Sequence, residues 1–303
     1  MSEPYDDFVA ATRARIGDGV EGWLDGLSEL IAELVARWDL SLGDPLPGGA
    51  IGYTVAAVRG GSDPVVLKVT YPDGWFPEEV AALLAWDGRG AVELIDHDPR
   101  GATLLERAVP GTSLLDDAYE QRAMMLAAAV LERLWIHDPG GVTTVEQEAG
   151  RWADTLVERN DWHGRPVAPG LVDEAVGVLR ELVPSQREAR LLHGDLHLGN
   201  VLSAARERWL AIDPKPLVGE REFDVTALVR DKQPELLEDR DAPARLQRRF
   251  DRLSDRLGCD RGRLRGWSIA VMVDYAVGCF EEGDEELGRA QARVAELLRS
   301  LRV

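Results

Sequence analysis

One stretch of the sequence decides the fold: His193-Gly194-Asp195-Leu196-His197-Leu198-Gly199-Asn200, followed shortly by Ile212-Asp213-Pro214. Two short apolar runs, 200–202 and 209–212, enclose a polar turn and predict two short strands. Asp195, Asn200 and Asp213 lie within 19 residues of the chain. We therefore expect them on a loop and on the strand ends that border it.

These polar residues suit metal-assisted phosphoryl transfer. Mg²⁺ prefers oxygen ligands and keeps some of its waters, so one carboxylate and one amide oxygen suffice when nucleotide phosphates complete the shell. Asn200 and Asp213 supply that pair. Asp195 stands five residues before Asn200, which matches the Asp-x-x-x-x-Asn spacing of kinase catalytic loops. We expect Asp195 to orient the acceptor hydroxyl, because a largely dissociative transition state needs little prior deprotonation.

Two histidines flank the catalytic aspartate. His193 and His197 could instead belong to an unrelated histidine and aspartate metal site, but the sequence offers no further ligands of the kind that such sites need. We expect His193 to brace the loop by hydrogen bonds. His197 is expected to do the same or to lie near the phosphates.

The chain before this stretch has the pattern of a small sheet with helices. The expected elements are a helix at 20–38, a hairpin of strands at 51–58 and 65–69, a helix at 78–86, and a second hairpin at 92–95 and 103–106. After Pro110-Gly111 the long helical patterns are 118–137, 145–159, 171–183, 235–256, 261–280 and 284–301. We predict an α+β fold, with residues 1–107 as a small N-terminal lobe that contains an antiparallel sheet, and residues 108–303 as a larger, mainly helical C-terminal lobe.

Composition limits the partners. The chain has 35 Lys and Arg against 54 Asp and Glu, a net charge of −19, which repels nucleic acid and anionic membranes and attracts a cationic small molecule. No run of about 18 apolar residues occurs, and the N-terminus lacks the basic and apolar blocks of a signal peptide. Cys259 and Cys279 lack the paired spacing of a zinc site. We expect a cytoplasmic protein with neither a nucleic acid nor a membrane as partner.

The pattern His-Gly-Asp-Leu-His-x-Gly-Asn, followed by Ile212-Asp213-Pro214, resembles the aminoglycoside phosphotransferase family, which shares the protein-kinase fold. The run 210–219 and the upstream run 86–92 are similar to its branch of streptomycin 6-phosphotransferases and hydroxyurea phosphotransferases. The resemblance covers most of the chain. It implies a protein-kinase-like bilobal fold, ATP as phosphoryl donor, with GTP not excluded, and Mg²⁺ as cofactor.

The resemblance also assigns roles to single residues. Asp195 matches the catalytic aspartate, and Asn200 and Asp213 match the metal-binding pair. Asp213-Pro214-Lys215 replaces the Asp-Phe-Gly of protein kinases, as expected for this family. Asp224 follows the metal strand and is expected to anchor the catalytic loop through hydrogen bonds.

The nucleotide site is expected around Lys68. This lysine ends the apolar run 65–69 as the kinase strand lysine does, where it would contact the α- and β-phosphates. An ordinary edge-strand lysine would look the same in isolation. Its expected partner is Glu79 on the following helix, with Glu78 as the alternative because pattern alone does not settle one residue of register.

Further nucleotide contacts are expected at the two ends of the small lobe. Gly48 and Gly49 are the nearest candidates for a loop over the phosphates, although a turn before a strand would look the same. If the run 104–111 is the hinge that the family implies, the Glu106 carbonyl and the Ala108 amide meet the adenine.

The sequence predicts the chemical class of the acceptor but not its identity. A streptomycin-type antibiotic carries guanidinium groups that acidic side chains bind through charge-assisted hydrogen bonds. Carboxylates in the helical segments are Asp154, Glu158, Asp274, Glu281 and Glu282, and solvated surface is the expected role of any one of them. The first hypothesis is therefore an antibiotic kinase. The alternatives are a kinase of hydroxyurea or another small metabolite, and a catalytically silent nucleotide-binding module.

Overall fold

The computed structural model describes residues 3–46 and 52–303. They fall into two compact units. Unit 1 comprises residues 1–111 and 203–213, and unit 2 comprises residues 112–202 and 214–303. The functional division into lobes 1–107 and 108–303 remains a prediction.

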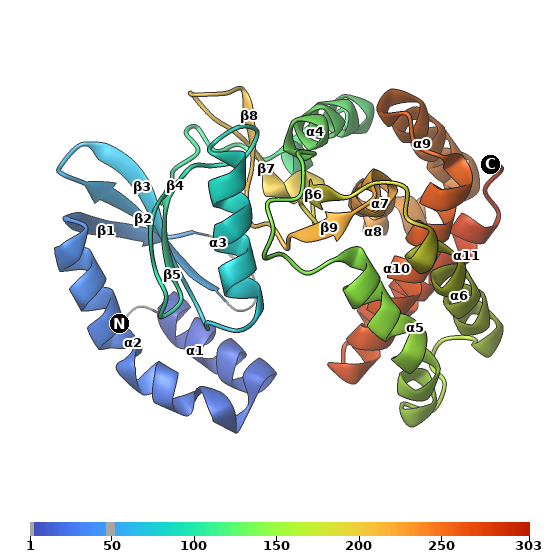
Figure 1. Cartoon of the computed structure of the whole chain (residues 1–303), viewed down its shortest axis with the longest axis horizontal. Helices are drawn as coiled ribbons and strands as arrows, with labels where there is room; N and C mark the ends of the chain where they lie inside the picture. Colours follow the sequence, from blue (N-terminus) through green and yellow to red (C-terminus); the bar gives the residue numbers. More distant parts are fainter. Residues whose placement is uncertain (1–2, 47–51) are drawn as a thin grey trace. The chain divides into compact units, whose positions relative to one another are not determined.

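Unit 1 is built on a five-stranded antiparallel sheet with the strand order β1-β2-β3-β5-β4 (Figure 1). Its strands are β1 (Leu40–Pro45), β2 (Gly52–Arg59), β3 (Asp63–Thr70), β4 (Leu94–Asp98) and β5 (Ala102–Glu106). Both predicted hairpins are present, and the pairing of β3 with β5 joins them into one sheet. The edge strand β1 was not predicted.

The helices of unit 1 are α1 (Glu3–Ile16), α2 (Glu21–Arg37) and α3 (Trp75–Trp86). Leucines at helical spacing on α2, such as Leu27 and Leu34, share one buried core with Leu67 and Val69 of β3. Successive side chains of a strand point to opposite faces. Lys68 therefore points away from that core, toward the face where α3 lies.

Unit 2 is mainly helical. Its helices are α4 (Glu120–Leu134), α5 (Val145–Trp162), α6 (Pro169–Leu182), α7 (Arg221–Arg230), α8 (Gln233–Glu238), α9 (Ala242–Leu257), α10 (Arg261–Glu281) and α11 (Glu285–Arg299). Helix α10 packs against α6, α7 and α11 (Figure 1). Of the short strands, β6 (Arg190–Leu192) pairs with β9 (Leu217–Gly219) within unit 2. Strand β7 spans Val201–Ser203, where the chain passes from unit 2 to unit 1, and β8 (Trp209–Ala211) belongs to unit 1. Among the residues described, no helix is both long and apolar enough to cross a membrane.

One predicted helix is wrong in extent. The segment 235–256 is not continuous, because α8 ends at Glu238 and α9 begins at Ala242. Pro243 lies in the first turn of α9, where its missing N–H costs nothing, whereas within one continuous helix it would break a hydrogen bond. The other predicted helices are present with ends shifted by a few residues. Helices α1 and α7 and the strands β6 and β9 were not predicted.

Candidate active site

Lys68 lies at the centre of a charged cluster in unit 1. Its Nζ is 2.7 Å from Glu79 Oε1 and 2.7 Å from Asp213 Oδ1. All three residues belong to unit 1. Glu79, rather than Glu78, is thus the carboxylate of α3 that forms an ion pair with Lys68.

The cluster keeps Lys68 charged although it is buried. Burial opposes the charged form of the ammonium, but Glu79 and Asp213 outweigh this effect and raise the pKa of Lys68 above its ordinary value. Burial raises the pKa of Glu79, and the neighbouring ammonium opposes that rise. A fixed, buried cation of this kind is a preorganised donor for phosphate oxygens.

Strand pairing brings Asp213 to this cluster. The N–H of Ala211 in β8 donates to the Gly90 carbonyl, and the N–H of Val92 donates back to the Ala211 carbonyl. Asp213 then adopts the left-handed conformation, with φ 54°. Such a conformation costs a non-glycine residue of the order of 1 kcal/mol and persists where the surroundings enforce it, commonly at functional sites.

Glu106 and Ala108, which are also predicted to contact the nucleotide, lie at and just after the end of β5. Glu106 ends β5, and its carboxylate accepts two hydrogen bonds from Arg206, at 2.7 and 3.0 Å. Ala108 follows in a segment without regular structure. Gly48 and Gly49 lie outside the described residues.

In unit 2, the loop from His193 to Asn200 is held by its own side chains. The Asn200 Nδ2 donates to the Asp195 carbonyl at 3.0 Å, which ties the two ends of the Asp-x-x-x-x-Asn segment together. His197 caps the following turn, since its Nδ1 accepts the N–H of Gly199 at 3.1 Å. His197 therefore lies in the loop as a brace.

Asp224 of α7 anchors the start of this loop. Its carboxylate accepts the N–H of His193 at 3.1 Å, the N–H of Gly194 at 2.8 Å and the indole N–H of Trp135 at 2.9 Å. Burial raises the pKa of Asp224 to about 6, and these three donors oppose the rise. His193 is fully buried, and its Nδ1 accepts the N–H of Asp195 at 3.3 Å.

Gly194 allows a close approach of two chain segments. Its φ is +76°, and a Cβ at this position would lie 1.8 Å from the carbonyl oxygen of Lys215. The N–H of Lys215 also donates to the carbonyl of His193 at 2.9 Å. The segment after Asp213 is thus fixed directly against the catalytic loop by groups of unit 2.

Two cations hold the Asp195 carboxylate. Lys215 Nζ is 2.7 Å from Oδ2, and Arg230 Nη2 is 2.7 Å from Oδ1. Burial opposes ionisation of Asp195, but the two cations outweigh it and lower its pKa below the ordinary value. Asp195 is therefore a carboxylate at neutral pH, able to accept a hydrogen bond.

The sequence did not point to every residue around this loop. For Lys215 the only indication in the sequence was its position two residues after Asp213. Arg230 and Asp231 carried none, although Asp231 accepts the N–H of Leu198 and so holds the loop from the other side. Both lie at the end of α7, a helix that the sequence pattern did not reveal.

Asn200 of unit 2 and, separately, Asp213 of unit 1 each carry a side-chain oxygen of the kind that Mg²⁺ prefers. Asn200 commits its Nδ2 to a backbone carbonyl, which leaves the amide oxygen as the atom for a metal. Asp213 accepts the hydrogen bond of Lys68 through Oδ1. In the part of the chain that the structure describes, no three His, Cys, Asp or Glu residues cluster as a metal site. A single amide or carboxylate oxygen of this kind suits a metal that takes further ligands from phosphates and water.

Two of the acidic residues considered for the acceptor are already paired. Arg159 of α5 donates to Asp274 at 2.6 Å and to Glu281 at 2.7 Å, both on α10. Burial raises the pKa of Asp274, and Arg159 opposes the rise. In this structure Asp274 and Glu281 therefore bind an arginine side chain of the protein itself.

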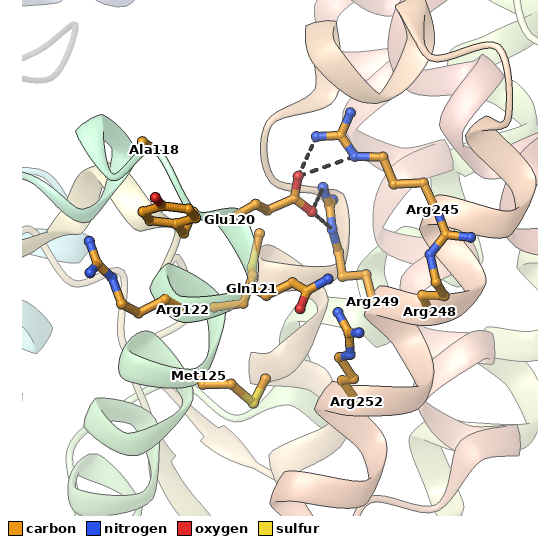
Figure 2. Close-up of a pocket in the computed structure, with 11 residues that line it drawn as sticks. Ala118, Glu120, Gln121, Arg122, Met125, Arg245, Arg248, Arg249 and Arg252 are labelled. Carbon is orange, nitrogen blue, oxygen red and sulfur yellow. Dashed lines mark hydrogen bonds and ion pairs between the residues drawn. The ribbon is translucent and has the colours of Figure 1, made fainter.

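A pocket of about 680 Å³ lies in unit 2 between α4 and α9. Figure 2 shows Glu120 joined to Arg245 and Arg249, with Arg248 and Arg252 beside them. Arg249 is buried and also donates to the Val229 and Asp231 carbonyls. These ion pairs connect the two helices. A lining so rich in arginine repels a cationic ligand, so the pocket is unsuited to an aminoglycoside.

Relatives at the level of sequence are kinases of small molecules. The chain is 33% identical over 294 residues to a streptomycin 6-kinase of Streptomyces glaucescens, covering 96% of this chain and 95% of the relative. It is 34% identical over 292 residues to a hydroxyurea phosphotransferase of Kitasatospora aureofaciens, covering 91% and 80% of the two chains.

Solved structures share the fold. Aminoglycoside phosphotransferase APH(4)-Ia matches with a TM-score of 0.64 at 20% identity, over 91% of this chain and all of that one. The choline kinase LicA from Streptococcus pneumoniae matches with a TM-score of 0.64 at 14% identity, over 90% and 99%. The predicted protein-kinase-like fold is thereby confirmed. Because residues 37–283 match the family model described as aminoglycoside/hydroxyurea antibiotic resistance kinase, this chain belongs to that family.

Proposed function

We propose that this protein transfers the γ-phosphoryl group of ATP to a hydroxyl of a cationic aminoglycoside of the streptomycin type, in the cytoplasm and with Mg²⁺ as cofactor. The observation that carries the proposal is the position of Lys68 Nζ, 2.7 Å from both Glu79 and Asp213. A buried ammonium held by a helix carboxylate is the group that nucleotide phosphates require in this fold. The names of the relatives support the acceptor class.

In this proposal the residues of unit 1 bind the nucleotide. Lys68 contacts the α- and β-phosphates, and Glu79 fixes the direction of its side chain. The Glu106 carbonyl and the Ala108 amide hold the adenine. Gly48 and Gly49 stay the predicted loop over the phosphates. Because backbone groups hold the purine ring in this proposal, the preference between ATP and GTP has to be measured.

The residues of unit 2 act on the acceptor and the metal. Asp195 accepts the hydrogen bond of the acceptor hydroxyl and turns its oxygen toward the γ-phosphorus. Asn200 binds the metal through its amide oxygen, with Asp213 as the second protein ligand. When bound, Mg²⁺ neutralises charge on the β- and γ-phosphate oxygens. His193, His197 and Asp224 keep the loop in place.

The acceptor class follows from charge as well as from relatives. A net charge of −19 favours a cationic acceptor over an anionic one. Hydroxyurea is the second candidate, because this chain is 34% identical to a hydroxyurea phosphotransferase and 33% identical to a streptomycin 6-kinase. Hydroxyurea is uncharged, so its turnover would not depend on ionic strength as that of a polycation does.

A direct transfer assay tests the proposal. Purified protein with Mg·ATP is given streptomycin or hydroxyurea, and ³¹P spectra show whether a phosphate ester forms and on which hydroxyl. Asp195→Asn is the matched control, since it keeps the size of the side chain and removes its charge. Transfer to hydroxyurea alone would select the second candidate. Binding of Mg·ATP without transfer to any acceptor in a broad panel would select the silent nucleotide-binding module.

A further inference from the structure

We infer that Lys215 is a catalytic residue of this enzyme, whose ammonium moves from Asp195 to the oxygens of the transferred phosphoryl group, and that Arg230 is the positioning residue that keeps Asp195 in place. The inference rests on the proposed phosphotransferase function. It concerns two residues of unit 2 to which the kinase motifs assign no role.

Asp195 holds one cation on each carboxylate oxygen. Lys215 Nζ lies 2.7 Å from Oδ2, and Arg230 Nη2 lies 2.7 Å from Oδ1. The acceptor hydroxyl has to donate to one of these same oxygens, so it competes with a cation for the best position. One of the two cations must therefore yield or share its site when the acceptor binds.

The surroundings of the two cations differ. The side chain of Arg230 is 22% exposed, and its guanidinium lies over the ring of Tyr275, 5.3 Å from the centroid. The side chain of Lys215 is 62% exposed. Lysine also has a flexible stem and a compact charge with three donors, whereas the guanidinium is a rigid fork. Lys215 is the cation that can move.

The backbone of Lys215 cannot move in the same way. Its N–H donates to the His193 carbonyl at 2.9 Å, and its carbonyl lies so close to Gly194 that no side chain fits there. The Lys215 side chain is thus anchored at its backbone, while its exposed tip pairs with Asp195 and is able to leave it. This is the arrangement of a tethered cation that serves two successive partners.

The reaction supplies the second partner. The bond from the γ-phosphorus to the oxygen that bridges it to the β-phosphorus breaks, and the bridging electron pair leaves with ADP. The acceptor oxygen forms a new bond to the γ-phosphorus, and its proton passes to Asp195. When the acceptor hydroxyl takes its place on the Asp195 carboxylate it displaces Lys215, and charge is spread over the three equatorial phosphoryl oxygens. The Lys215 ammonium then stabilises those oxygens.

Chemical rescue tests this role. In Lys215→Ala we expect kcat to fall about 100-fold with little change in the KM for ATP, as when one transition-state donor is removed. Small primary alkylammonium ions should restore part of that kcat, which a purely structural lysine would not allow. Lys215→Arg should keep more activity than Lys215→Met, because it retains the charge. Arg289→Ala, which breaks an exposed pair on α11, is the matched control and should behave as wild type.

Arg230→Met tests the positioning role through the split between kcat and KM. Loss of the ion pair with Oδ1 lets the Asp195 carboxylate turn, so kcat should fall while the KM for ATP stays near its wild-type value. Arg230→Lys should restore kcat in part, because it keeps a cation at this place.

Every assay also measures ATP hydrolysis, in which water is the acceptor. A wild-type protein that transfers phosphate to neither an antibiotic, hydroxyurea nor water would refute the proposed function. A working wild type whose Lys215→Ala variant stays within about threefold in kcat would refute the role of Lys215 alone. So would a loss of activity that alkylammonium ions do not restore in a variant whose thermal unfolding matches wild type.

Discussion

The Asp224 carboxylate accepts the backbone N–H of Gly194 at 2.8 Å, so one buried side chain of α7 fixes the start of the loop that carries Asp195. We expect Asp224→Asn to lower kcat at pH 8 by about 10-fold to 100-fold, because the amide turns a donor toward N–H groups that need an acceptor. Steady-state kinetics checks this. A variant with full kcat would show that the loop does not need this anchor.

The same residue should make stability depend on pH. Burial raises the pKa of Asp224 to about 6, above the value of about 3.9 for an unfolded aspartate. The folded protein therefore binds this proton more tightly, and between pH 4 and 6, roughly, this residue's contribution to the unfolding free energy falls as pH rises. Urea unfolding of Asp224→Asn should lack that slope. The two proteins should also converge in kcat below about pH 6, where the wild-type carboxyl is itself protonated.

Lys68 and Glu79 should be coupled in stability as well as in activity. Lys68→Met leaves the Glu79 carboxylate buried without its cation, which should lower the free energy of unfolding by about 3 kcal/mol and abolish transfer. Glu79→Gln keeps the size of the side chain but weakens its hold on the ammonium, so it should raise the KM for ATP.

The double variant separates the two effects. Lys68→Met with Glu79→Gln removes both charges, so most of the lost stability should return while activity stays absent. Denaturant unfolding and the transfer assay are run on the same four proteins. Equal destabilisation of the single Lys68→Met and the double variant would contradict the coupling.

The metal prediction concerns Asn200. In Asn200→Ala the amide oxygen is lost, so the Mg²⁺ concentration that gives half of the maximal rate should rise by about tenfold or more. The change also removes the hydrogen bond to the Asp195 carbonyl. Asn200→Asp is the informative partner, because it restores an oxygen ligand while losing that donor. If both variants show the wild-type dependence on Mg²⁺, Asn200 is not a metal ligand.

Local pattern was sufficient for most of the fold. Helix α2 shows its leucines at helical spacing, and β2 and β3 are joined by a glycine-rich turn, so both features are visible in a single sequence. Helix α7 was missed because eight of its ten residues are buried, which leaves no amphipathic stripe to detect. Strands β6 and β9 have three residues each, too short for a recognisable alternation.

Some residues of the site could likewise be predicted from the sequence, and others could not. Asp195, Asn200 and Asp213 were found because their chemistry and spacing lie in one short stretch. The choice of Glu79 over Glu78 needed the register of α3, which only the structure supplies. Arg230 acts on a residue 35 positions away through tertiary contact. Arginine is common in this chain, so nothing in its local sequence singles it out.

The buried pair of Glu220 and Arg263 should matter for stability and not for the reaction mechanism. Glu220 is fully buried, and Arg263 Nη2 donates to it at 2.7 Å beside the indole N–H of Trp267. Removing one partner leaves a buried charge uncompensated, so Arg263→Met should lower the free energy of unfolding by about 3 to 5 kcal/mol. Arg289→Met breaks an exposed pair with Glu285 and should leave unfolding unchanged. Denaturant unfolding compares the two, and KM values measured well below the unfolding transition should equal wild type in both. If Arg263→Met unfolds like Arg289→Met, the buried pair contributes no net stability and the packing around Trp267 alone holds α10 in place.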